Sequence, residues 1–111
     1  MRNEIIIEFI QHDRQYSEYD WANIILNDEK VGKVRCLIES NVLTIYSIKV
    51  FPEYRSSGCA SKFIEKAKKK FDIIFADRVR VTAFGFWEKM GFVQIEDGNW
   101  VFLKKVREFN K

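Results

Sequence analysis

The chain has 111 residues, a length that suits one domain over residues 1–111 and is too short for two. Hydrophobic residues make up 47% and aromatic residues 15% of the sequence, which excludes an intrinsically disordered chain. The net charge of +3 at pH 7 is too small to indicate a nucleic-acid partner by itself. No apolar run approaches the roughly 20 residues of a membrane span, and the first residues lack a signal-peptide pattern, so we expect a cytoplasmic protein without a membrane partner.

The sequence offers few ligands for a metal ion. Its two cysteines are Cys36 and Cys59, and its one histidine is His12. Their spacing matches no zinc motif, and two cysteines do not make a disulfide framework. We therefore expect free thiols and no metal site.

The first half of the sequence predicts antiparallel strands. β-Branched, aromatic and alternating apolar residues mark four segments, at 3–10, 22–26, 31–38 and 42–50. Turn-forming residues separate the last three of these segments, which is typical of a meander.

The predicted strand at 42–50 contains an irregularity. Leu43 and Ile45 are followed by Ile48 and Val50, so the two-residue alternation slips by one position. A β-bulge explains the slip, and so does a strand that is covered on both faces. Bulges commonly re-aim a strand beside a functional site.

Residues 50–71 predict a strand end, a turn and a helix. Pro52 cannot donate a ladder hydrogen bond, and apolar residues then recur up to Phe71 at the spacing of one helical face. The helix is predicted to begin near Ser57 without an acidic residue in its first turn, where helices usually favour one. Free backbone NH groups beside Gly58 and Arg55 therefore suit a bound phosphate.

The rest of the sequence predicts a strand, a short helix and a hairpin. The segments are 72–76, 83–90, 92–96 and 99–105, with Gly91 ending the helix and Asp97-Gly98 forming the hairpin turn. Residues 77–82 fit no element, and 107–111 are expected to be a frayed tail. The predicted fold class is α/β with a mixed sheet: antiparallel N-terminal strands, a right-handed strand–helix–strand unit, a short helix and a C-terminal hairpin.

Two motifs resemble those of the GCN5-related N-acetyltransferases (GNATs). Arg55, Gly58 and Ala60 match the family's acyl-CoA signature, which is Arg or Gln, two residues, Gly, one residue, and Gly or Ala. Residues 86–92, Phe-Trp-Glu-Lys-Met-Gly-Phe, match a later family segment, an aromatic pair followed by Glu-Lys-x-Gly-Phe. The resemblance covers residues 38–106 and implies a compact member with a shortened N-terminal region.

This resemblance implies acetyl-CoA as the acyl donor. Backbone NH groups of residues 55–61 would hold its pyrophosphate, and the backbone of residues 48–50 would pair with its pantetheine arm like an added strand. The residues thereby assigned to cofactor binding are Ile48, Lys49, Val50, Arg55, Ser56, Ser57, Gly58, Cys59, Ala60, Ser61, Phe86 and Trp87.

The implied reaction is direct attack of a primary amine on the acetyl group, but the sequence departs from the family's acid–base pattern. Trp87 stands where the family commonly has a Tyr acid, and Arg80 replaces a frequent Asn. The predicted strand at 42–50 also contains no carboxylate. The candidate catalytic residues are Tyr46 and Glu39, with His12 able to act through water.

The acceptor side departs from the family pattern as well. Only ten residues, 12–21, are available for helices between the first two predicted strands, where the family usually has two helices. We therefore expect an open acceptor side, suited to an amine on a small molecule, peptide or protein, or to a partner subunit that completes the wall. An exposed edge of the C-terminal hairpin is able to pair in a homodimer.

Two other functions fit the sequence. The departures from the acid–base pattern are also expected for a catalytically weak or inactive acyl-CoA-binding module. An aminoacyl-tRNA-directed or nucleic-acid-directed protein is the further alternative, suggested by the lysine-rich helix and the basic C-terminal end, although nucleic acid is not the expected partner.

Overall fold

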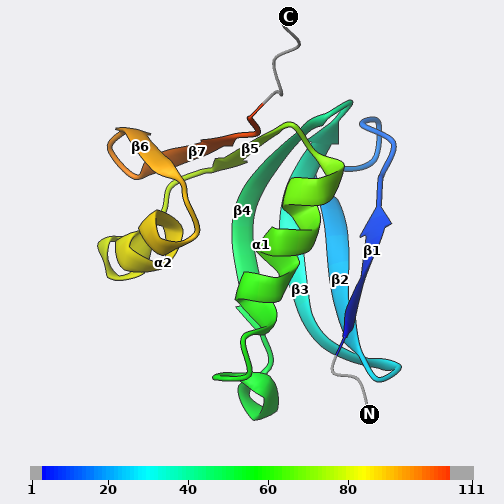
Figure 1. The fold of residues 1–111 in the computed structure, drawn as a ribbon. Coiled ribbons are helices and arrows are strands. Elements are labelled where there is room, and N and C mark those ends of the chain that lie inside the picture. The colour runs from blue at the N-terminus through cyan, green and yellow to red at the C-terminus, as the bar shows by residue number, and fades with distance from the viewer. Residues whose placement is uncertain (1–3, 106–111) are drawn as a thin grey trace, which may run out of the picture.

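The structure is a computed structural model that describes residues 4–105. Its strands form one seven-stranded sheet in the order β1-β2-β3-β4-β5-β7-β6 (Figure 1). The strands are β1 Ile5–Ile10, β2 Asp20–Leu26, β3 Glu29–Glu39, β4 Val42–Val50, β5 Ile73–Ala76, β6 Val93–Glu96 and β7 Asn99–Leu103. β4 and β5 pair in parallel, whereas the other neighbours pair antiparallel. This order confirms the predicted mixed sheet, the N-terminal meander and the C-terminal hairpin.

Helices connect the strands in the second half of the chain. The α-helices are α1 Cys59–Lys70 and α2 Phe84–Lys89, and two 3₁₀ turns cover Pro52–Tyr54 and Val81–Ala83. None of the helices in the described residues is long and apolar enough to cross a membrane. The segment 77–82, which the sequence did not assign, is a loop that runs into the second 3₁₀ turn. The predicted tail at 107–111 lies outside the described residues.

Element boundaries differ from the predicted ones by one or two residues at most ends, as is usual for helix and strand ends. α1 begins two residues after Ser57, because Gly58 takes a left-handed φ of 79° and acts as its N-cap. β2 begins at Asp20 rather than at residue 22, because the Asp20 side chain is buried and bonded inside the fold, as described below.

α1 covers one face of the sheet, running across β2, β3 and β4 in Figure 1. The residues that α1 buries are Cys59, Phe63, Ile64 and Ala67. Alternate residues of β2, β3 and β4 are buried under it, namely Ala22, Ile24, Val34, Cys36, Leu43 and Ile45. The residues between them, Lys33 and Arg35 among these, therefore point to the opposite face.

The C-terminal half of α1 is linked to the end of α2. Lys68 Nζ donates a hydrogen bond to the Met90 carbonyl at 2.6 Å. Gly91 follows with a φ of 89°, and the Phe92 NH donates back to the Trp87 carbonyl at 3.0 Å. These bonds end α2 at the glycine that the sequence indicated.

Residues 11–19 connect β1 and β2 and contain a turn but no helix. A buried carboxylate fixes this connection to the sheet. The fully buried Asp20 side chain accepts hydrogen bonds from the His12 NH at 2.7 Å, Arg14 Nη2 at 2.5 Å and the Ile38 NH at 2.8 Å. Burial acts to raise the pKa of Asp20, but these hydrogen bonds outweigh it and hold the pKa below its ordinary value. The ionised carboxylate thereby ties the connection to β3.

Replacing Asp20 by Asn should lower the free energy of unfolding by about 2 kcal/mol, because an amide cannot replace both the charge and the acceptor capacity of the carboxylate. Since the pKa of Asp20 is lower in the folded than in the unfolded chain, its stabilisation is present above about pH 4 and is lost as pH falls through the folded pKa. Urea unfolding across this range should show a shallower acid loss for Asp20→Asn than for the wild type.

The matched control for this experiment is Glu18→Gln, which neutralises an exposed carboxylate of the same connection. It should change the free energy of unfolding by less than about 0.5 kcal/mol. Equal effects of the two substitutions would contradict the structural role given to Asp20.

Candidate functional site

The sheet opens between β4 and β5. The two strands pair in parallel from Val42 and Ile73 up to Ile45 and Ala76, and the Asp77 NH donates to the Ile45 carbonyl at 2.9 Å. Beyond that bond, β4 continues beside β3 alone, while the chain after β5 turns away towards α2. One edge of the second half of β4 therefore has no strand partner among the described residues.

A β-bulge lies where the strands separate. Arg35 pairs with Ser47 and Cys36 pairs with Ile45, so Tyr46 is an extra residue on β4. Of the two explanations for the slip in alternation, the structure therefore selects the bulge. The bulge bends β4 away from β5 and keeps both Tyr46 and Ser47 off the face that packs on α1.

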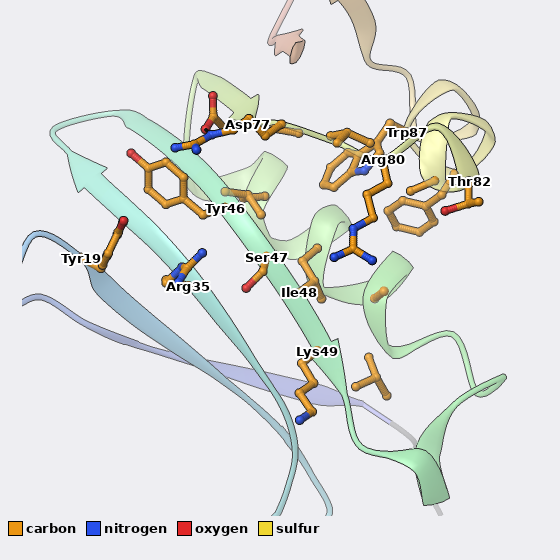
Figure 2. Close-up of a pocket in the computed structure, with 18 of the residues that line it drawn as sticks. Tyr19, Arg35, Tyr46, Ser47, Ile48, Lys49, Asp77, Arg80, Thr82 and Trp87 are labelled. Carbon is orange, nitrogen blue, oxygen red and sulfur yellow. Dashed lines mark hydrogen bonds and ion pairs between the residues drawn. The ribbon is translucent and has the colours of Figure 1, made fainter. Parts of the chain in front are cut away.

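A cavity of about 780 Å³ occupies the opening, a size in the range of small-molecule sites. Figure 2 shows that its walls come from β3, β4, the start of α1, the segment after β5, and α2. The sequence-predicted site residues that line it are Tyr46, Ile48, Lys49, Val50, Arg55, Ala60, Phe86 and Trp87. Gly58 and its neighbours Ser56, Ser57, Cys59 and Ser61 lie at the start of α1 without lining the cavity, and Glu39 and His12 also lie outside its lining.

The start of α1 leaves backbone donors without helical partners. No side chain caps the helix, and its first turn contains no acidic residue. Ser57 Oγ bonds instead to the Tyr54 carbonyl, and the Cys59 side chain is buried in the core. A Cβ added to Gly58 would meet no atom within 4 Å, so the space beside this helix start is open. The arrangement suits an anion.

The α2 wall of the cavity is aromatic. Trp87 is only 6% exposed, and its ring centroid lies 5.1 Å from that of Phe86 and 4.8 Å from that of Phe92. Phe86 is only partly buried and lies against the core as well as on the cavity. This wall can pack against an apolar ligand, but the indole NH of Trp87 is no replacement for a tyrosine acid.

Tyr46 lies at the opposite end of the cavity, with its ring edge against Tyr19 at a centroid distance of 5.2 Å. Burial, followed by the negative charge of Asp77, raises the pKa of Tyr46 above its usual value of 10. The phenol therefore stays protonated at neutral pH, so it is able to donate a proton but cannot act as a phenolate base.

Several cavity residues were missed by the sequence analysis. Tyr19 and Arg35 come from the segments around β2 and β3, while Asp77 and Arg78 follow β5. Asp77 is the only carboxylate among the described lining residues, and its Oδ2 lies 3.0 Å from Arg78 Nε. No local pattern marks these four residues, because strand pairing alone brings them together.

Comparison with protein-family models gives no match for this sequence. A curated protein of Oceanobacillus iheyensis, named uncharacterized N-acetyltransferase OB1458, is 35% identical over 52 residues, which are 47% of this chain. The chain spans about a third of that relative, with the matched part covering 32% of its length.

Solved acetyltransferase structures match over most of the chain. The putative N-acetyl transferase YhhK of Escherichia coli, bound to coenzyme A, has a TM-score of 0.67 at 14% identity and covers 90% of this chain and 98% of its own. The Bacillus subtilis N-acetyltransferase YlbP with coenzyme A has a TM-score of 0.64 at 15% identity, with coverages of 89% and 96%. A GNAT acetyltransferase from Elizabethkingia anophelis with acetyl-CoA bound has a TM-score of 0.65 at 12% identity, with coverages of 92% and 99%. The chain therefore has the GNAT fold, and the resemblance drawn from its two motifs is confirmed at the level of fold.

Proposed function

We propose that this protein is an N-acetyltransferase that transfers the acetyl group of acetyl-CoA to a primary amine. The observation that carries the proposal is the cavity between β4 and β5, which extends from the uncapped start of α1 to the phenol of Tyr46. The acetyltransferases of the same fold that have coenzyme A or acetyl-CoA bound support it.

The residues around the start of α1 fit the phosphate end of the donor. Backbone NH groups within 55–61 would hold the pyrophosphate, and Gly58 leaves room for it because it has no side chain. Arg55 adds a positive charge beside the cavity, where its Nε donates to the Val50 carbonyl at 3.3 Å. Acetyl-CoA supplies an acetyl group activated as a thioester.

The second half of β4 fits the pantetheine arm. The edge of Ile48, Lys49 and Val50 that faces away from β3 has no strand partner in the described chain. Apart from the Val50 carbonyl, which accepts from Arg55, its backbone groups are available to pair with the arm's amides. Phe86 and Trp87 form the apolar wall across the cavity. One backbone NH of this edge would polarise the acetyl carbonyl.

The residues at the bulge carry the proton transfers in this proposal. Asp77 takes a proton from the acceptor ammonium, directly or through water, so that a neutral amine attacks the acetyl carbon. As the new C–N bond forms and the C–S bond breaks, Tyr46 donates its proton to the departing sulfur. The second proton of the amine nitrogen then returns through water to the Tyr46 oxygen. Glu39, at the end of β3, stays a prediction for a base that acts through water.

The proposal places this chemistry in the cytoplasm. Cys36 and Cys59 are both free and buried, which suits a reducing compartment. A second candidate function is an acyl-CoA-binding module without catalysis, which the buried Trp87 favours because it stands at the family's usual acid position.

Replacing Gly58 by Glu should abolish measurable acetyl-CoA binding in calorimetric titration, because a carboxylate would occupy the open space beside the helix start and repel phosphate. Gly58→Gln is the matched control, since it adds the same bulk and the same backbone strain at positive φ without the charge. We expect Gly58→Gln to bind at least tenfold more tightly than Gly58→Glu. Unchanged affinity in Gly58→Glu would place the pyrophosphate elsewhere.

Replacing Tyr46 by Phe should lower kcat by about 10²-fold or more while the affinity for acetyl-CoA stays within twofold, because the variant loses the proton donor but keeps the ring. Release of the coenzyme A thiol measures the rate across a panel of amines. Tyr16→Phe, at a tyrosine that is 80% exposed and outside the cavity, is the control and should leave kcat unchanged. Retained kcat in Tyr46→Phe would reject Tyr46 as the acid, and tight binding without transfer by the wild type would favour the binding module.

A further inference from the structure

The cavity is lined by cationic side chains along its whole length, including parts that lie away from the proposed phosphate site. Its described lining contains five cationic side chains and one carboxylate, Asp77, which is already paired with Arg78. The cationic residues are Arg35, Lys49, Arg55, Arg78 and Arg80. Such a lining disfavours an acceptor whose only charge is an ammonium, and it favours an acceptor that also carries a negative charge.

Arg35 lies on β3, away from the start of α1 that is proposed to bind the donor's phosphates. It pairs with Ser47 in the sheet, three residues along β4 from Val50, a separation of about 10 Å. Its side chain projects from the face of the sheet opposite α1, because its neighbours Val34 and Cys36 are buried under that helix. Figure 2 shows Arg35 with Tyr19 and Tyr46 on the other side of β4 from Trp87 and Arg80.

The guanidinium of Arg35 packs on an aromatic ring, and one of its nitrogens has no hydrogen-bond partner among the described residues. Its Cζ lies 4.8 Å from the ring centroid of Tyr19, which in turn packs on Tyr46. Its Nε is buried and has no hydrogen-bond partner among residues 4–105. Because this nitrogen is closed to solvent, a ligand in the cavity would reach the guanidinium through its terminal N–H groups.

A carboxylate matches this group best. The guanidinium presents its two terminal nitrogens as a planar fork, whose N–H groups two carboxylate oxygens can accept from together. Tyr19 covers the guanidinium at 4.8 Å, which favours approach of an acceptor group in the guanidinium plane. Asp77, which lines the same cavity, has a second oxygen able to accept from an ammonium.

We propose that the acceptor is a small molecule carrying both a primary amine and a carboxylate, in which Arg35 binds the carboxylate and Asp77 receives the ammonium. This inference rests on the proposed acetyltransferase function for its chemistry. It narrows the acceptor class to amino-acid-like molecules and makes Arg35 the residue that determines acceptor specificity.

The experiment compares three acceptors that differ in their anionic group: β-alanine with a carboxylate, O-phosphoethanolamine with a phosphate, and propylamine with neither. In the wild type, kcat/KM for β-alanine should exceed that for propylamine at least tenfold. In Arg35→Gln this ratio should fall by about 10–100-fold, the loss expected for a charged hydrogen bond, and chiefly through KM for β-alanine. Arg35→Lys, which keeps the charge but loses the fork, should give an intermediate ratio.

Lys33→Gln is the matched control. Lys33 lies on the same face of β3, over the Trp21 ring at 5.4 Å, and does not line the cavity. Its substitution should leave the β-alanine to propylamine ratio unchanged. An unchanged ratio in Arg35→Gln, or an equal fall in Lys33→Gln, would overturn the assignment to Arg35, and a wild-type preference for O-phosphoethanolamine would overturn the carboxylate.

A second measurement needs no turnover. The Nε–Hε resonance of Arg35 in the wild type, assigned by its loss in Arg35→Lys, should shift saturably when β-alanine is added and should not shift with propylamine. Equal shifts with both amines would overturn the subsite. A specific shift without any acetyl transfer would support the carboxylate subsite and reject the enzymatic function, so the two proposals fail separately.

Discussion

The extra residue in β4 is the constraint on which the cavity depends. β4 pairs with β3 along nearly its whole length but with β5 only as far as Ile45. An added residue at Tyr46 bends the strand at that point, and the bend separates it from β5. The unpaired backbone edge, the space beside it and the orientation of Tyr46 all follow from this local change in pairing.

The same bend gives the cavity two chemically different ends. On the side of α1, backbone NH groups and the aromatic wall around Trp87 provide directional donors and an apolar surface. On the other side, Arg35, Tyr46 and Asp77 provide charges and an exchangeable proton. The two ends therefore suit two different reactants that meet at the bulge.

Short-range patterns in the sequence predicted much of the fold and the donor end of the site. The slip between Ile45 and Ile48 and the absence of an acid at the start of α1 are visible within a few residues. The charged end was not predicted, because Tyr19, Arg35 and Asp77 lie on separate segments that only strand register brings together. A short connection was predicted at 12–21, close to the observed 11–19, but the bonds that hold it to Asp20 depend on distant backbone groups such as the Ile38 NH.

The hydrogen bond from Lys68 to the Met90 carbonyl ties α1 to the end of α2. The first turn of α1 lines the cavity through Ala60. Its C-terminal half is hydrogen-bonded to the end of α2, the helix that carries Phe86 and Trp87. A displacement of α1 along its axis would therefore move the aromatic wall in the same direction. The start of α1 and the aromatic wall are thus mechanically coupled, and a movement at one is transmitted to the other.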